Sequence, residues 1–561
     1  MNQIAKTGVA VGAAVALTLI ASSMGPREVQ LAAFDDQGQE FWPDFKDGNA
    51  VAELEVVEFR EASAAAYPFV VKRDDKGRWT IPSHGNYAAD AKDRMGKAAA
   101  MLIGLKKQTV VGDVKGRHAD YGVVDPLDAG TETAGRGKRI KMKDSAGNVL
   151  ADLIIGKELE GKMGVHYVRL PDKKRVYRTK LEGELSTKFA DWIETDLLKA
   201  TSWDISKVTF DNYSVDEQNG TINKGEQHVV TKDDAGKWAF AGIDATKEEP
   251  NEDKLREIGD TLGQIKIVGV RPKPEGLTAM LDQATGFDRQ ILQQTLAQKG
   301  FFLTRQGKLV SNEGDLLFET KKGVRYTLRF GEVVMGEGDA VTAGTPNPNE
   351  KPKEGEAQKP GNNRYLMVTA EFVEDLLTKP AGTRLPQDQL DKRTAARTEI
   401  EAIQKAVEAY RTKHENKLPE LLAKLTEKPA EGEPLLKELK KDPWDNDYQL
   451  QVQGDTYAIV SFADGKAEGG EGIAADVRSD RLPAEDELKK TADAFAEHDR
   501  KVEEGRKEAD KLTKRFGLWY YVIDQALFTK LKPKRDDLVK PKAATPPPTP
   551  PGNGGTTEPG K

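Results

Sequence analysis

The sequence predicts an α+β, multidomain fold, and three observations lead to this prediction. The residues from Val70 to Trp79 (VVKRDDKGRW) return in pattern from Val229 to Trp238 (VVTKDDAGKW). Strand-type and helix-type spacings of apolar residues follow each copy in the same order. The 561 residues are enough for about three or four domains of ordinary size. We therefore predict two homologous α+β repeats.

Each copy of this motif is typical of a β-hairpin. An apolar strand leads into an Asp-Asp-x-Gly turn, whose glycine can take a positive φ, and a second strand opens with Trp. The paired aspartates could in principle bind a cation. No further acidic ligand stands at short spacing, so we interpret them as turn residues.

Composition narrows the function classes. Lys and Arg number 85 against 92 Asp and Glu. This near balance gives no basic field of the kind that nucleic acid requires, so we expect no nucleic-acid partner. The chain has no cysteine, which excludes disulfides, thiolate nucleophiles and sulfur-ligated metals.

The N-terminus predicts membrane targeting. Gly8 to Met24 is an uncharged run that follows Lys6. Its length is at the short end for a spanning helix, and Ala21-Ser22-Ser23 is a candidate cleavage site, so an anchor and a signal peptide both remain open. We favour an uncleaved anchor over residues 1–28, with the positive end inside. The protein would then be single-pass in the inner (cytoplasmic) membrane, with its bulk periplasmic or extracytoplasmic.

The first repeat is predicted over residues 51–200, after a polar linker at 29–50. Its helix, at 88–105, places Met95 and Leu102 on one apolar face. A second helix, through 185–192, is expected to close the repeat. The predicted strands lie at 51–59, at both sides of the hairpin turn, and at 138–143, 149–155, 166–170 and 175–179.

The second repeat is predicted over residues 201–375 and 516–540. Leu255 and Leu262 repeat the helical spacing of the first copy, and an additional helix is expected at 287–300. A Pro/Gly/Glu-rich loop at about 337–363 is expected to be disordered. The final strand, 519–523, and helix, 525–531, follow only after a long interval.

That interval, residues 376–515, is predicted to be an insertion at a hairpin tip. In the first repeat, the same turn consists only of the residues from Pro171 to Lys174. Exposed tips accept added chain when the inserted piece brings its ends together. Charged helical stretches at about 388–413 and 484–516 would then form either a paired stalk or two solvated helices lying on the repeats.

The repeats resemble a family of membrane-anchored bacterial proteins, domain of unknown function 4340. The motifs that carry the resemblance are Tyr326-Thr-Leu-Arg-Phe-Gly331, Arg364-Tyr-Leu-Met-Val-Thr369 and Trp519-Tyr-Tyr-Val-Ile523. It covers about 50–375 and 515–540. The resemblance implies an envelope protein, sometimes associated with gliding or transport-type machinery, and brings no catalytic residues.

The insertion resembles the globular part of the type II secretion system protein G, the major pseudopilin. An amphipathic helix from Ala396 to Tyr410, an Asp-Pro-Trp turn at Asp442 and a glycine-rich loop from Ala463 to Asp476 follow one another in the order typical of that family. The match spans about 395–478. It predicts a pseudopilin-like α+β module with a calcium-binding C-terminal loop.

Carried over by position, Asp464 and Asp476 stand where the family has calcium-binding aspartates, and Phe462 offers a backbone carbonyl. Ala474 stands where an acidic residue is common, which weakens the expected affinity for calcium. Calcium is the one cofactor we expect. The alternative is a glycine-rich surface loop with its acids in water.

A second departure concerns assembly. Pseudopilins are processed just before one continuous apolar helix that packs into a fibre, and this N-terminus has no such motif. The pseudopilin-like helix begins near residue 395, far from the predicted anchor, and carries charge on its outer face. The resemblance therefore predicts a borrowed binding or spacing module that does not polymerise by that route.

No catalytic residues are predicted. The six histidines show no metal-ligand spacing, and no nucleophile elbow, phosphate-binding loop or His-Glu-x-x-His motif occurs. We therefore predict that the chain is not an enzyme and identify no small-molecule substrate. The Pro-rich tail, 541–561, is expected to be disordered.

These observations predict a non-enzymatic, membrane-anchored envelope protein. It would act as an accessory, binding or assembly module of a secretion, pilus-like or transport machinery, with envelope or secretion-type proteins as partners. Two alternatives stay open. One is a polysaccharide-active envelope hydrolase that uses two acids, and the other is a purely structural spacer between membrane and wall.

Overall fold

The chain is described here from a computed structural model. The described residues are 8–9, 11–18, 36–61, 64–130, 133–183, 185–217, 219, 221–274, 277, 286–335, 339–343, 363–470 and 474–542.

The first lobe is built on a nine-stranded antiparallel sheet with the order β4-β3-β2-β1-β6-β7-β8-β9-β5. Helix α2 (Lys92–Leu102) buries Met95, Ala98 and Leu102 against it. The strands are β1 (Glu53–Arg60), β2 (Ala65–Arg73), β3 (Trp79–Ile81), β4 (Tyr87–Ala88), β5 (Thr109–Gly112), β6 (Lys138–Lys143), β7 (Val149–Glu158), β8 (Val165–Arg169) and β9 (Val176–Lys180).

The second lobe is built on an eight-stranded sheet with the order β14-β13-β10-β19-β20-β21-β25-β16. This order corresponds, strand for strand, to β3-β2-β1-β6-β7-β8-β9-β5 of the first lobe. Helix α4 (Glu252–Gly263) buries Leu255, Ile258 and Leu262, as α2 does in the first lobe. The strands are β10 (Ile205–Asp211), β13 (Gln227–Lys232), β14 (Trp238–Phe240), β16 (Gly269–Pro272), β19 (Asp315–Thr320), β20 (Val324–Val334), β21 (Asn363–Phe372) and β25 (Trp519–Asp524).

Helix α6 (Gly286–Ala297) and the small hairpin β17 (Phe301–Leu303) and β18 (Leu309–Ser311) belong to the second lobe alone. They cover the other face of its sheet, where Leu296 and Phe301 pack with Tyr520. The additional helix predicted at 287–300 is therefore present, and it ends three residues early.

The duplicated motif forms the predicted hairpins. Gly77 and Gly236 take positive φ angles of 75° and 86°. Asp74 and Asp233 each accept a backbone N–H within their own turn through Oδ1. The first aspartate of each pair is therefore a turn residue.

Two helix predictions for the first lobe need correction. The helix predicted at 88–105 is the shorter α2, followed by Gly104 at φ 68°. The closing helix predicted at 185–192 is wrong, because only Phe189–Trp192 form one 3₁₀ turn, η6. Ser186 and Trp192 explain why, since the indole Nε1 donates to the Ser186 carbonyl at 2.7 Å and offers the backbone an alternative to the helical ladder.

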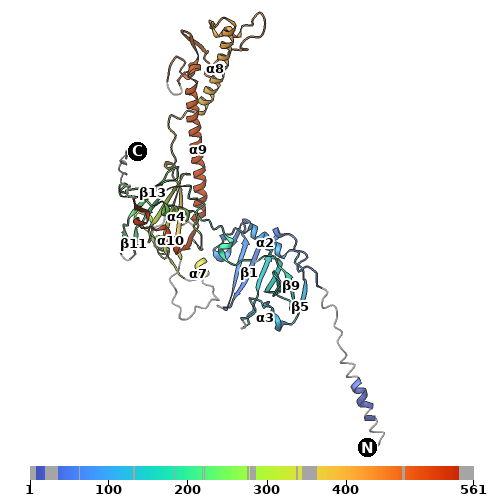
Figure 1. Ribbon diagram of the computed structural model, residues 1–561. Helices are drawn as coiled ribbons and strands as arrows, with labels where there is room; N and C mark the ends of the chain where they lie inside the picture. The colour runs from blue at the N-terminus through green and yellow to red at the C-terminus, as the bar shows by residue number, and fades with distance from the viewer. Residues whose placement is uncertain are drawn as a thin grey trace, which may run out of the picture.

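The two lobes contact each other directly (Figure 1). The rings of Tyr87 and Trp519 lie 4.9 Å apart, edge to face. His84 Nε2 lies 3.0 Å from the Thr342 hydroxyl of α7 (Asp339–Thr342). Buried residues of both sheets form one continuous core.

The insertion leaves β21 and returns through the long helix α9 (Leu482–Gly517) (Figure 1). The C-terminal part of α9 packs on β21, and Ala509, Leu512 and Phe516 are buried there. Its N-terminal part extends away from both lobes to the inserted module. At 1.5 Å per residue, its 36 residues span about 54 Å.

The stalk is neither of the two predicted arrangements. Helix α8 (Gln387–Lys413) belongs to the core of the module and does not pair with α9 along its length. An irregular segment accompanies α9 instead, and Arg384 of this segment forms an ion pair with Asp499. A single helix therefore carries the module, together with the irregular segment at 377–386, which we call the strap.

The inserted module packs α8 on a three-stranded antiparallel sheet. Its strands are β22 (Gln449–Gln453), β23 (Thr456–Ser461) and β24 (Val477–Arg478). The helix buries Ala396, Ile400, Ile403 and Val407 against this sheet and the loops around it. The sequence predicted an amphipathic helix here, from Ala396 to Tyr410, and these four side chains form its buried face.

Three predictions concern segments that are only partly described. Among the residues described near the N-terminus, 11–18 are helical, and no described helix is long and apolar enough to cross a membrane. Of the loop predicted at 337–363, Asp339–Thr342 form α7 and Asn363 begins β21, while 344–362 lie outside the described residues. The tail begins later than predicted, because Pro541 still belongs to β26 (Val539–Pro541), which pairs with β15 (Glu248–Pro250).

Candidate functional site

The candidate site is the loop between β23 and β24 of the inserted module. Asp442 fixes its entry. This side chain is 4% exposed, accepts the backbone N–H of Asn446 at 2.8 Å and accepts the Ser461 hydroxyl at 2.5 Å. The Asn446 amide in turn donates to the Ala463 carbonyl at 2.9 Å. The Asp-Pro-Trp turn therefore clamps the end of β23, where the loop begins.

The loop itself bends sharply. Ala463 and Lys466 take positive φ angles of 49° and 57°, and Gly469 and Gly470 take 104° and 100°. A Cβ added to Gly470 would lie closer than 3.0 Å to the Ala474 carbonyl oxygen. Glycine is required there because the chain folds back on itself.

The Ala474 carbonyl lies on the inner side of this bend. Its oxygen is within 3.1 Å of where a Cβ on Gly465 would stand, as well as close to Gly470. The sequence prediction treated Ala474 only as a lost carboxylate. Its carbonyl oxygen is a candidate ligand that side-chain reasoning missed, and the glycines that precede it, Gly465 and Gly470, were the available signal.

Asp476 is the predicted site residue with the most informative environment. Its Oδ2 accepts the Gly469 N–H at 2.9 Å, while its Oδ1 is buried and has no hydrogen-bond partner. A buried carboxylate oxygen without a partner is unfavourable. A bound cation would relieve this.

The other predicted residues are placed less favourably. Asp464 lies in the short turn η9 (Ala463–Gly465) and is exposed, and Phe462 is half-buried at the start of the loop. Within the described part of the chain, no group of three His, Asp or Glu side chains could hold a metal ion. Glu471 lies outside the described residues. The donor set therefore fits a hard cation only through Asp476, Asp464 and backbone carbonyls.

A neighbouring cation also acts on the loop. Arg478 of β24 hydrogen-bonds Asp480 at 2.9 Å. This bond raises the pKa of the Arg478 guanidinium, and the charges of Asp480, Asp476 and Glu468 add to the effect. Arg478 thus offsets part of the negative charge that a calcium ion would otherwise meet.

Two histidines of the first lobe, His84 and His118, are buried. His84 stacks on Phe189 with ring centroids 4.1 Å apart, and burial lowers its pKa to about 4. His118 Nε2 lies 2.8 Å from the Lys174 carbonyl oxygen, and burial lowers its pKa as well. Among the described residues, neither histidine is hydrogen-bonded to a carboxylate, and the partners of His84 are the hydroxyls of Ser83 and Thr342, at 2.9 and 3.0 Å.

Comparison with known proteins identifies the module. The family "Type II secretion system (T2SS), protein G" matches residues 385–480. The type II secretion system core protein G of Vibrio cholerae serotype O1 is 37% identical over 105 residues, which cover 69% of that protein and 16% of this chain. By this module, the chain belongs to the protein G family. The resemblance predicted at about 395–478 is confirmed, and that range lies within the match.

A second family, "Domain of unknown function (DUF4340)", matches residues 79–283. The match begins at β3 of the first lobe and ends in the second lobe, just before α6. The predicted resemblance is therefore confirmed for this central part. The protein G module lies outside it, at the tip of the β21–β25 hairpin, so the two families meet in one chain as the sequence indicated.

Proposed function

We propose that this protein is a non-enzymatic envelope component that presents a protein G-type module to a secretion-type assembly. The observation that carries the proposal is the position of the module, at the end of α9 remote from both lobes (Figure 1). A module that served only to stabilise the lobes would pack on them. A module held away from them has its surface free for a partner.

The attachment of the module supports presentation in a fixed direction. Arg397 of α8 forms ion pairs with Asp486 of α9 and with Glu401 of its own helix. At the other end, Gly505 brings α9 close to the second lobe, since a Cβ there would lie 2.5 Å from the Lys322 carbonyl oxygen. Both ends of the connection are therefore packed.

The module's own start argues for a role outside fibre formation. Helix α8 begins after Pro386 with Gln387, Asp388 and Gln389. Such polar residues cannot replace the continuous apolar helix that a fibre-forming subunit needs. The module therefore acts as a lateral or terminal binding partner in our proposal, and the lobes supply its base.

We further propose that the loop of the module binds calcium through Asp464 and Asp476, with carbonyl oxygens of Phe462 and Ala474. The unpartnered Oδ1 of Asp476 supports this. Calcium supplies a hard cation that would hold the two ends of the loop together. The chain itself prepares this arrangement, because Asp442 fixes the start of the loop and Gly470 allows the loop to bend.

Location and origin are part of the same proposal. The apolar run from Gly8 to Met24 would anchor or target the chain to the inner membrane, with the lobes outside the cytoplasm. The matching strand orders of the two lobes support an internal duplication. The protein G module would have entered the second copy at its hairpin tip.

Affinity capture of the tagged full chain from detergent-solubilised membranes tests the function. A matched variant replaces residues 387–481 with a short Gly-Ser linker and keeps α9 and both lobes. We expect envelope secretion-type proteins with the full chain and their loss with the variant. Equal recovery with both chains, or recovery of no envelope machinery, would contradict the proposal.

A further inference from the structure

The start of the sheet-packed helix is built alike in both lobes. In the first lobe, the Asp90 N–H donates to the Trp192 carbonyl at 2.8 Å, just before α2. In the second lobe, the Asn251 N–H donates to the Leu538 carbonyl at 2.9 Å, just before α4. The turn η6 therefore lies where α11 (Arg535–Leu538) lies in the second lobe.

The segments that lead to these turns differ. In the second lobe, α10 (Gln525–Leu531) follows β25 and packs on α4, with Phe528 and Leu531 buried. Lys530 of α10 lies 3.3 Å from Glu257 of α4, and Lys254 lies 2.9 Å from the same carboxylate. A short amphipathic helix thus fills this place, and its lysine completes a charge network.

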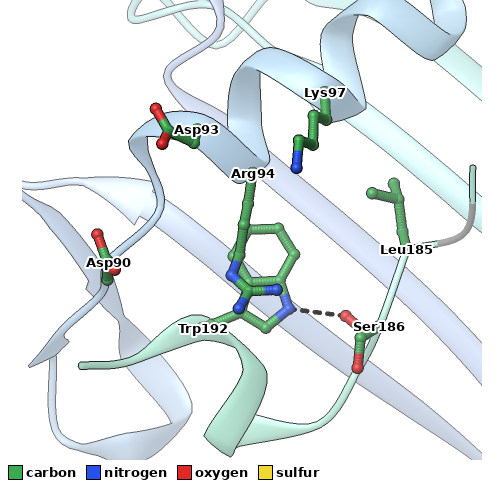
Figure 2. A pocket seen from close by; sticks show the side chains of 7 residues that line it. All are labelled: Asp90, Asp93, Arg94, Lys97, Leu185, Ser186 and Trp192. Carbon is green, nitrogen blue, oxygen red and sulfur yellow. Dashed lines mark hydrogen bonds between the residues drawn. The ribbon is translucent and has the colours of Figure 1, made fainter. Parts of the chain in front are cut away.

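In the first lobe, the described residues between β9 and η6 form no helix, and a cavity of about 330 Å³ lies beside them (Figure 2). Arg94 and Lys97 reach over it from α2, the indole of Trp192 lies beneath, and Leu185 and Ser186 stand on the facing segment. Its lining residues are Asp90, Asp93, Arg94, Lys97, Leu185, Ser186 and Trp192.

One of the two helix charges at this place is reversed between the lobes, because Lys97 stands where the second lobe has Glu257. By the shared helix register, Arg94 and Lys97 stand where the second lobe has Lys254 and Glu257. No carboxylate among the described residues forms an ion pair with Arg94 or Lys97, although both are exposed. Two like charges three residues apart repel each other, so a carboxylate between them is favoured.

We propose that this cavity of the first lobe binds a short amphipathic helix of a partner protein, with an Asp or Glu between Arg94 and Lys97. Apolar side chains of that helix would rest against Leu185 and Trp192, as Phe528 and Leu531 of α10 are buried in the second lobe. The inference concerns the first lobe and does not depend on the role of the protein G module.

The second lobe, and not the volume of the cavity, favours a helix as the occupant. The volume of about 330 Å³ lies at the lower end of the range for small-ligand pockets. The chain itself shows what the equivalent place accepts, which is a helix of two turns with one charged side chain. Charge complementarity then changes the lysine of that helix to an acid.

The test uses two labelled peptides with the sequence of residues 524–538, one native and one carrying Lys530→Glu. Their binding to the full chain is measured by fluorescence anisotropy. We expect the Lys530→Glu peptide to bind about tenfold more tightly, because two exposed ion pairs replace repulsion. The same peptide is repelled by Glu257, so the second lobe does not compete for it.

Two variants of the full chain assign the binding to the cavity. The Arg94→Glu/Lys97→Glu chain should reverse the preference between the peptides. Lys92→Glu changes an exposed charge on the same helix outside the cavity and should leave both affinities unchanged. The three side chains that these variants change are exposed, so thermal melting should report intact folds.

Equal affinity of the two peptides, no binding of either up to about 1 mM, or a preference that Arg94→Glu/Lys97→Glu leaves intact would overturn the inference. Displacement of the peptide by free phenylacetate at the same concentration as by unlabelled peptide would also overturn it, in favour of a small carboxylate.

Discussion

The two lobes have the same strand order. They differ in the connection between β8 and β9 and in its counterpart between β21 and β25. The first lobe turns within Pro171 to Lys174. The second lobe places a family module and a 36-residue helix between β21 and β25. The ladder between the two strands is kept in both cases. A hairpin tip thus accepts a domain because neither strand's hydrogen bonds depend on it.

The equivalence of the lobes extends to single atoms. Val168 of β8 pairs with Ile155, and Leu366 of β21 pairs with Phe330. Ile155 and Phe330 each stand one residue before a glycine at a β-bulge. His166 Nδ1 lies 3.3 Å from the Gly156 carbonyl oxygen, and Arg364 Nη1 donates to the Gly331 carbonyl at 2.5 Å. The bulge and its side-chain partner therefore occur twice.

The largest expected effect tests this equivalence. A Cβ on Gly156 or on Gly331 would come closer than 3.0 Å to a backbone carbonyl, of Tyr121 or of Lys299. We expect Gly156→Ala and Gly331→Ala each to lower the free energy of unfolding by about 3 kcal/mol. Urea unfolding measures this. A neutral effect of one variant beside a large effect of the other would break the comparison.

The next effect concerns α9, which only the second lobe has. Gly505→Ala would place a Cβ 2.6 Å from the Phe372 ring, while it removes the glycine penalty in a helix. We expect a net loss of about 1–2 kcal/mol, measured by thermal unfolding. Gly96→Ala in α2 is the matched control. Nothing lies within 4 Å of that Cβ, so it should gain about 0.5–1 kcal/mol.

The contact between the lobes should depend on pH. Burial, with a smaller effect of Arg271, lowers the pKa of His84 to about 4 from the usual 6.5 of histidine. The unfolded chain therefore binds a proton at a higher pH than the folded chain, and stability is lost as the pH falls from about 6.5 to 4. His84→Gln should flatten this part of the curve in urea titrations. If the slope of stability against pH stayed unchanged in this variant, His84 would not be the cause of the pH dependence.

The smallest expected effect is stabilisation by calcium, which should act on the inserted module and not on the lobes. If the loop binds calcium, ten times the dissociation constant of calcium should stabilise the module by about 1.4 kcal/mol. Differential scanning calorimetry of the full chain, with calcium or with a chelator, measures this. Asp464→Asn/Asp476→Asn should abolish the response without moving the transitions of the lobes. A calcium response that survives in this variant would place the ion elsewhere.

The sequence predicted both hairpins and the strands at 138–143 and 519–523, because Asp-Asp-x-Gly turns and apolar alternation are local signals. It did not predict β5, β16 or β19. It misplaced the helix at 185–192, since the bond from Trp192 to the Ser186 carbonyl is invisible in a spacing pattern. It misread the stalk, because helical periodicity does not say what a helix packs against. It named Asp476 and the Phe462 carbonyl but not the Ala474 carbonyl, because the close approach of that carbonyl to Gly465 and Gly470 is a feature of the folded backbone.

The length of helix α9 sets the direction in which the module points. Each residue added to its free part would rotate the module by about 100° and advance it by about 1.5 Å. Eighteen residues, about five turns, would lengthen the reach by about 27 Å and restore the original heading. Insertions of intermediate length would point the module elsewhere. Relatives that share such a helix should therefore differ in its length by whole numbers of turns, with a matching change in the strap beside it.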